Sequence, residues 1–127
     1  MQAEIIFTNE PIVIPPLLLP TRDVGACVEF HGIVRELEDG RALAGLDYEA
    51  HESMARKEIG RLFDQLQTVH PVVSVLFIHR LGWVPVGEAS MFVRVLAAHR
   101  GEALAFCEKA IDRLKQDVPI WKRAGPD

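Results

Sequence analysis

The sequence predicts an α+β fold in which two main helices pack against mixed or antiparallel strands. Two observations predict this class. Apolar residues recur at three- and four-residue steps in only two segments, 52–67 and 101–117, whereas the other apolar segments are short and bounded by turns. No GxGxxG or GxxxxGK[ST] cradle joins a strand to a helix. The predicted order is β-loop-β-β-α-β-β-α, and the 127 residues fit a single domain over 1–127.

The first half of the chain contains three predicted strands. Residues 3–7 form a short strand, and residues 9–24 hold four prolines and predict a loop with at most one helical turn. Residues 25–35 form a strand whose side chains alternate between two faces. The charged segment 36–42 contains an Asp-Gly pair, which is typical of a hairpin turn. Residues 43–50 are therefore predicted to pair back as a strand.

The second half alternates helices and strands. The first helix, over 52–67, ends before Pro71, and residues 72–79 are apolar on both faces, which is typical of a strand covered on both sides. Residues 81–87 predict a turn, and residues 89–98 predict another strand.

The second helix covers 101–117 and stops at Pro119, so residues 119–127 are predicted as a C-terminal tail. The predicted apolar stripe of this helix consists of Leu104, Cys107, Ile111, Leu114 and Val118.

Composition excludes several classes of protein. The formal net charge is −4, from 14 basic and 18 acidic residues, which disfavours a general nucleic-acid binder. Cys27 and Cys107 form neither a disulfide framework nor a CxxC site, so we expect two buried, reduced thiols in a cytoplasmic protein. The N-terminus lacks the features of a signal peptide, and the apolar run over 12–20 is interrupted by prolines and too short to cross a bilayer.

Metal and serine-hydrolase sites are also disfavoured. The five histidines form neither an HxH nor an HExxH pattern, so no metal site or metal cofactor is predicted. None of the chain's few serines lies in a GxSxG elbow.

A basic segment near the C-terminus is the first positive indication of a site. Residues 94–123 hold seven basic and four acidic side chains, a local charge of +3 in an acidic protein. One interpretation of this basic segment is a binding site for a specific anionic ligand. The other is a solvated helix face, and charge alone does not separate the two.

The position of two dipeptides refines this choice. His99-Arg100 follows a strand and precedes a helix, where free backbone N–H groups favour an anion. Arg100 suits a phosphate, and His99 suits proton transfer near neutral pH. The alternative for His99 is a histidine satisfied by the backbone. His79-Arg80 leads into a turn, and we interpret it as structural.

Two lysines flank the proline that ends the second helix. Lys115 and Lys122 lie on either side of Pro119 and close to Ile120 and Trp121. A lysine that such neighbours partly desolvate can act as a nucleophile or proton donor, although most lysines are simply solvated.

Three stretches of the sequence resemble one known family. GACVEFHGIVR resembles the opening strand of the MoaE family, the large (catalytic) subunit of molybdopterin synthase. VLFIHRLGWVPVGEASMFVRVLAAHR resembles its central block, and AIDRLKQDVPIWKR resembles its closing signature. The match runs in order from residue 25 to residue 123, and the joint occurrence of AHR, LK and P-x-WK is specific. The resemblance implies the α/β hammerhead fold of that family.

The resemblance also implies a reaction. The family is a sulfurtransferase that converts cyclic pyranopterin monophosphate into the dithiolene molybdopterin. The sulfur comes from the C-terminal thiocarboxylate of a small ubiquitin-like carrier, MoaD. Two large subunits form a homodimer with a carrier at each end, as a heterotetramer, and the step needs no metal or nucleotide cofactor.

The family's roles fall on matching residues of this chain. Lys115 matches the key catalytic lysine, and Lys122 matches the second lysine of the active site. The resemblance further implies substrate contacts by Arg35, Phe30, His99 and Arg100, the last two across the dimer. Two anions in one pocket require several fixed cations, which these residues supply.

The chain departs from the family pattern at its end. Ala124 replaces the usual glutamate, and only GPD follows. This short tail motivates an alternative function, a MoaE-like docking module that binds the carrier or a pterin without turnover. A third alternative is a dimeric scaffold that binds neither, in which Arg35, Lys115 and Lys122 would not converge.

Overall fold

The protein, described here for residues 1–124 of a computed structural model, has two helices and three sheets. Its elements follow one another in the order β1 (Gln2–Thr8), β2 (Ala26–Ile33), β3 (Leu37–Glu38), β4 (Arg41–Ala42), β5 (Gly45–Ala50), α1 (Glu52–Val69), β6 (Ser74–Arg80), β7 (Gly82–Pro85), β8 (Ala89–Ala97), α2 (Arg100–Asp117) and β9 (Ile120–Ala124). The α+β class and both helices are confirmed.

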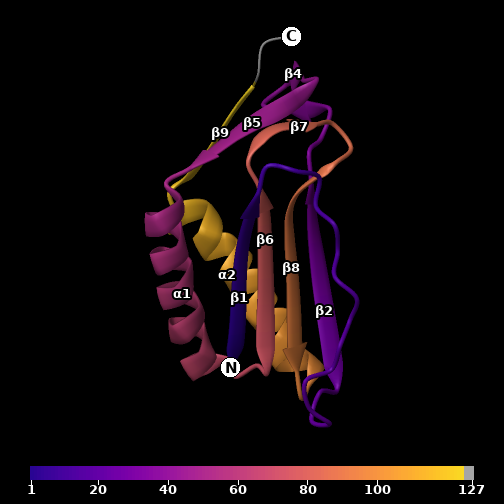
Figure 1. The fold of residues 1–127 in the computed structure, drawn as a ribbon, viewed down its shortest axis with the longest axis vertical. Helices are drawn as coiled ribbons and strands as arrows, with labels where there is room; N and C mark the ends of the chain where they lie inside the picture. The colour runs from indigo at the N-terminus through magenta and orange to yellow at the C-terminus, as the bar shows by residue number, and fades with distance from the viewer. Residues whose placement is uncertain (125–127) are drawn as a thin grey trace.

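The main sheet has the strand order β1-β6-β8-β2 (Figure 1). β1 runs parallel to β6, and the other two pairings are antiparallel. Both helices lie on one side of this sheet, with α2 behind it and α1 beside β1 in the view of Figure 1. The three-stranded sheet β7-β5-β9 lies across one end of the main sheet, near the last turn of α2.

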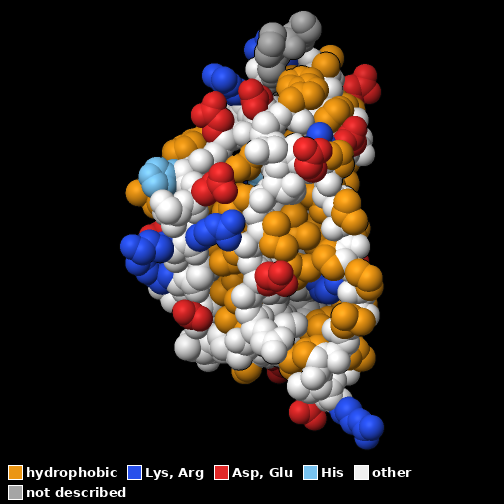
Figure 2. Space-filling view, viewed as in Figure 1, with side chains coloured by type: hydrophobic (Ala, Val, Ile, Leu, Met, Phe, Trp, Pro, Cys, Tyr) orange, Lys and Arg blue, Asp and Glu red, His pale blue; other side chains and the backbone are white. Residues whose placement is uncertain are grey.

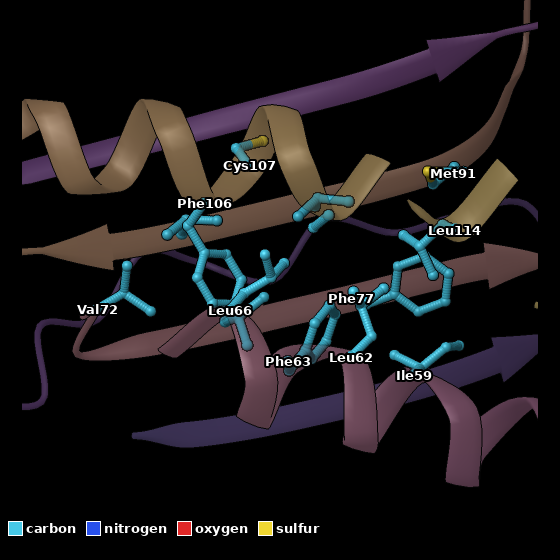
Figure 3. Close-up of a cluster of buried hydrophobic side chains, with 14 of the residues drawn as sticks. Ile59, Leu62, Phe63, Leu66, Val72, Phe77, Met91, Phe106, Cys107 and Leu114 are labelled. Carbon is cyan, nitrogen blue, oxygen red and sulfur yellow. The ribbon is translucent and has the colours of Figure 1, made fainter. Parts of the chain in front are cut away.

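The core fills the space between the helices and the main sheet. Phe63 of α1, Phe106 of α2 and Phe77 of β6 are fully buried there and contribute the largest apolar surfaces. Figure 3 shows these side chains together, with Leu114 and Met91 at one end of the cluster. Burial of this apolar surface explains why both helices form where their periodicity predicts them.

The predicted hairpin turn is confirmed, but the pairing of the strand after it was predicted wrongly. Asp39 and Gly40 both have positive φ, 51° and 77°, which is the geometry of a tight two-residue hairpin. The hairpin joins only β3 and β4. β5 does not pair back on β2, because it instead lies between β7 and β9 in the second sheet.

Two segments that were predicted without strands form the rest of that second sheet. Residues 81–87 contain β7, and the C-terminal tail contains β9; the tail's residues 125–127 lie outside the described residues. Both strands pair only with β5, which is distant in sequence, so the local pattern of residues does not reveal them. Leu46 and Val84 are buried in a second small apolar cluster, which accounts for the stability of this pairing.

The proline-rich segment 9–24 forms no helical turn and contacts the face of the main sheet away from the helices. Arg94 of β8, which is only 8% exposed, donates to the carbonyl oxygens of Pro15 (2.9 Å) and Pro16 (3.5 Å). Its Nε also donates to Glu29 at 2.7 Å. A buried guanidinium therefore holds this segment on the sheet.

Two burial predictions were wrong. Leu104, placed in the apolar stripe of α2, is 54% exposed, and Ala103 and Phe106 are buried in its place. Cys27 is exposed, because it lies on the face of β2 that points away from the helices, whereas Cys107 is buried as expected. Both cysteines are free, and burial raises the pKa of the Cys107 thiol.

Candidate functional site

A cavity of about 590 Å³ lies where the main sheet, the end of α2 and the second sheet meet. Its lining consists of Phe30, Gly32, Ile33, Val34, Arg35, Glu38, Leu46, Tyr48, His79, Ser90, Met91, Leu114, Lys115, Ile120 and Lys122. Met91 and Leu114 also belong to the main core, so the cavity begins at the end of the core seen in Figure 3. The cavity thus combines apolar walls with several charged groups.

Four residues singled out in the sequence come together in this cavity: Phe30, Arg35, Lys115 and Lys122. They come from four different parts of the fold. Phe30 lies on β2, Arg35 follows that strand, Lys115 lies in the last turn of α2 and Lys122 lies on β9. Arg35, Lys115 and Lys122 thus converge, whereas the third alternative predicted that they would not.

Local backbone structure explains the positions of Arg35 and Lys122. The residue before Arg35, Val34, is buried, and its backbone N–H and C=O pair with Glu88 and Gly87 at 3.0 and 2.9 Å. Lys122 is paired in register with Tyr48 of the central strand β5. Both cations are therefore next to or within backbone that hydrogen bonds to a neighbouring segment hold in place.

The charges of the cavity are unbalanced. Lys122 Nζ lies 2.5 Å from Glu38 Oε1, and Glu38 is the one acidic residue that residues 1–124 contribute to the lining. Within residues 1–124, neither Arg35 nor Lys115 forms an ion pair. Two cations are thus available to an anionic ligand, and the third is held by a carboxylate that such a ligand can replace.

Lys115 and Lys122 are not desolvated, although their apolar neighbours in the sequence suggested that they would be. The Lys122 side chain is 52% exposed, and Lys115 is also exposed. Trp121 is 57% exposed and, as the preceding residue of β9, lies on the opposite face from Lys122. Both lysines are therefore exposed cations of the cavity rather than buried amines.

His99 and Arg100 do not lie in the cavity of their own chain. α2 begins at Arg100, one residue before the predicted start, and His99 is the N-cap residue, but the His99 side chain makes no capping hydrogen bond. Lys115 follows Arg100 by fifteen residues on the same helix, which corresponds to roughly 22 Å along the axis. Both residues are exposed at the far end of α2.

Sequence reasoning missed four polar residues of the cavity: Glu38, Tyr48, His79 and Ser90. Tyr48 is predictable as a strand residue, but nothing in the sequence indicates that β5 borders the cavity. His79 was assigned a structural role. It is 3% exposed, its Nδ1 donates to the carbonyl oxygen of Arg80 at 2.8 Å, and burial lowers its pKa to about 4.

Between residues 1 and 124, no group of three or more His, Cys, Asp or Glu side chains is arranged to hold a metal ion. Neither helix in this part of the chain is long and apolar enough to cross a membrane.

Comparison with known proteins agrees with the resemblance. The model of the MoaE protein family matches residues 7–117. The molybdopterin synthase catalytic subunit of Drosophila mojavensis is 43% identical over 107 residues, covering 84% of this chain and 29% of that protein. The chain spans 29% to 51% of the length of this relative and its counterparts from rice and Drosophila virilis.

Solved structures show the same fold. The molybdopterin synthase from Staphylococcus aureus has a TM-score of 0.82 and 31% identity, covering 98% of this chain and 90% of that one. A subunit in the complex of subunits 1 and 2 of the molybdopterin-converting factor from Helicobacter pylori has a TM-score of 0.70 and 26% identity, covering 96% and 83%. From the family match, these identities and the shared fold, this chain belongs to the MoaE protein family.

Proposed function

We propose that this chain is the catalytic subunit of a molybdopterin synthase. In this reaction, sulfur passes from the thiocarboxylated C-terminus of a small ubiquitin-like carrier to cyclic pyranopterin monophosphate. The thiocarboxylate sulfur forms a carbon–sulfur bond on the pterin in place of a carbon–oxygen bond. Water then hydrolyses the bond between the sulfur and the carrier's acyl carbon, which leaves the carrier with a carboxylate, and two such transfers give the dithiolene. The observation that carries the proposal is the convergence of Arg35, Lys115 and Lys122 in one cavity.

The charge of the cavity suits both reactants. The pterin carries a phosphate and the carrier a thiocarboxylate, so two anions must come close together. Fixed cations in a partly enclosed site stabilise such an arrangement more than they would in water. We assign Lys115 as the proton-transferring residue next to the carrier's tail and Lys122 as the second catalytic cation, with Arg35 and Phe30 in contact with the substrate.

We further propose that the protein acts as a homodimer within a heterotetramer with two carriers. His99 and Arg100 lie at the far end of α2 from their own Lys115, so they contribute to a cavity only if a second copy brings them there. The exposed apolar residues of segment 9–24, together with the apolar side chains on the viewed face in Figure 2, favour such an association. With both thiols free, we assign the reaction to the cytoplasm.

The decisive experiment mixes the purified protein with thiocarboxylated carrier and cyclic pyranopterin monophosphate, and measures the dithiolene product. The wild-type chain should form product, and Lys115→Ala should form almost none. Lys109→Ala is the matched control, because Lys109 is exposed on the same helix and does not line the cavity.

The outcome separates the two main functions. Carrier binding without product from the wild-type chain would reject the synthase and favour the docking module. Equal product from the wild-type chain and Lys115→Ala would reject the role of Lys115 while retaining the reaction.

A further inference from the structure

His79 is the most buried polar residue in the lining of the cavity. It lies on β6, on the face that carries Phe77 toward the helices, and is paired in register with Met91 of β8. The Tyr48 ring stands edge-on to the imidazole with centroids 5.0 Å apart, and the Phe77 ring lies 6.1 Å away. Packing on two sides therefore fixes the orientation of the His79 ring.

The hydrogen bond to the backbone assigns the tautomer of His79. The carbonyl oxygen of Arg80 is an acceptor only, so the Nδ1 atom at 2.8 Å from it carries the proton. Nε2 is then an unprotonated acceptor, and no other described residue bonds to it. Because burial lowers the pKa of this imidazole to about 4, the ring stays neutral at physiological pH and presents a lone pair rather than a charge.

The polar groups of the cavity are thus of two kinds. Arg35, Lys115 and Lys122 are exposed cations, which attract an anion from solvent. His79 is a buried neutral acceptor, which has no attraction for an anion and requires an N–H or O–H donor. A ligand that satisfies both has an anionic group at one end and an N–H or O–H donor at the other.

We propose that His79 selects and orients the ring of the ligand, its Nε2 accepting a hydrogen bond from a ring N–H or amino group while the cations hold the phosphate. This proposal rests on the proposed function, since a pterin monophosphate is a ligand with these two ends. It adds a specificity-determining residue to the cavity and a direction of binding, with the heterocycle innermost and the phosphate toward Lys115 and Lys122.

Three substitutions and two ligands test this role. His79→Phe keeps a flat ring but removes the acceptor, and His79→Gln supplies an amide oxygen in place of Nε2. His31→Phe is the matched control, because His31 is exposed on the opposite face of the main sheet. Binding of cyclic pyranopterin monophosphate is measured by calorimetry on the full chain, and inorganic phosphate serves as the probe for the cations alone.

We expect His79→Phe to weaken pterin monophosphate binding about tenfold, the loss of one hydrogen bond, with phosphate affinity unchanged within about twofold. His79→Gln should stay within about threefold of the wild-type chain. If His79→Phe does not fold, His79→Met removes the strong acceptor with a flexible side chain that adapts to its surroundings.

Three results would overturn the proposal. Equal pterin binding by the wild-type chain and His79→Phe would reject the role of His79 and leave the proposed function intact. A parallel loss of phosphate affinity would show that His79 only maintains the shape of the cavity. A wild-type chain that binds phosphate but no pterin monophosphate would reject the substrate itself, and the role of His79 with it.

Discussion

Glu38 Oε1 lies 2.5 Å from Lys122 Nζ and joins the β3–β4 hairpin to β9 across the cavity. Among the described residues of the lining, the pair combines one of three cations with the one acidic side chain. An anionic ligand that binds Lys122 must compete with this carboxylate. Glu38 therefore lowers the affinity of the free cavity for anions while holding Lys122 in place.

The substitution Glu38→Gln is expected to tighten binding of pterin monophosphate or inorganic phosphate by about twofold to fivefold, the range for a half-exposed ion pair. Calorimetric titration at low and high salt measures the effect, which should shrink as salt screens the charges. Glu36→Gln is the control, because Glu36 is exposed next to the same hairpin and outside the lining. Equal gains for both variants would mean that only net charge matters.

Mixed dimers test whether the far end of α2 completes the cavity of a second copy. Arg100→Ala and Lys115→Ala should each be nearly inactive alone. Mixed in equal amounts and allowed to exchange, they should recover about a quarter of the wild-type activity, because half of the dimers are mixed and each holds one intact site.

The matched mixture for this experiment is Lys115→Ala with Lys122→Ala. Both lysines line the cavity of one chain, so no mixed dimer contains an intact site and no activity should return. Recovery in this control, or none in the first mixture, would contradict the placement of Arg100 across the dimer.

Arg94 is expected to control the stability of segment 9–24. Arg94→Gln removes the ion pair to Glu29 and the hydrogen bonds to two proline carbonyls, which should lower the free energy of unfolding by about 1–3 kcal/mol. Chymotrypsin should also cut faster near the exposed Leu17 and Leu18. Urea unfolding and timed digestion measure the two effects.

The control for Arg94 is Arg61→Gln. Arg61 pairs with Glu58 on the surface of α1, with a side chain that is 63% exposed, so its loss should cost less than about 0.5 kcal/mol. Digestion of Arg94→Gln at the wild-type rate would show that the prolines alone hold the segment.

Stability should depend on pH through His79. Its pKa is about 4 in the folded chain and near 6.5 when unfolded, so between these values the unfolded state binds more protons. The contribution of the neutral imidazole is complete above pH 6.5 and is lost as the pH falls toward 4, by up to about 3 kcal/mol. Urea unfolding of the wild-type chain and His79→Gln should give curves that converge over this interval, whereas parallel curves would contradict the assignment.

Much of the fold is present in local sequence pattern. The periodicity of α1 and α2, the alternation in β2 and the Asp-Gly turn at 39–40 each reflect interactions within a few residues. The joint occurrence of the short motifs AHR, LK and P-x-WK likewise indicates the family. These features are predictable because the residues that produce them are neighbours in the chain.

The second sheet and the cavity depend on contacts between distant residues. β5 leaves the hairpin and pairs with β7 and β9, some 35 to 75 residues later, so neither its partners nor the strand in the tail follows from local alternation. That pairing places Lys122 next to Glu38 and Tyr48 beside His79. The sequence alone predicts four residues of the cavity, because they match motifs of the family. The roles of the buried acceptor His79 and of the carboxylate Glu38 emerge only when the two sheets meet, because burial and charge pairing depend on the whole fold.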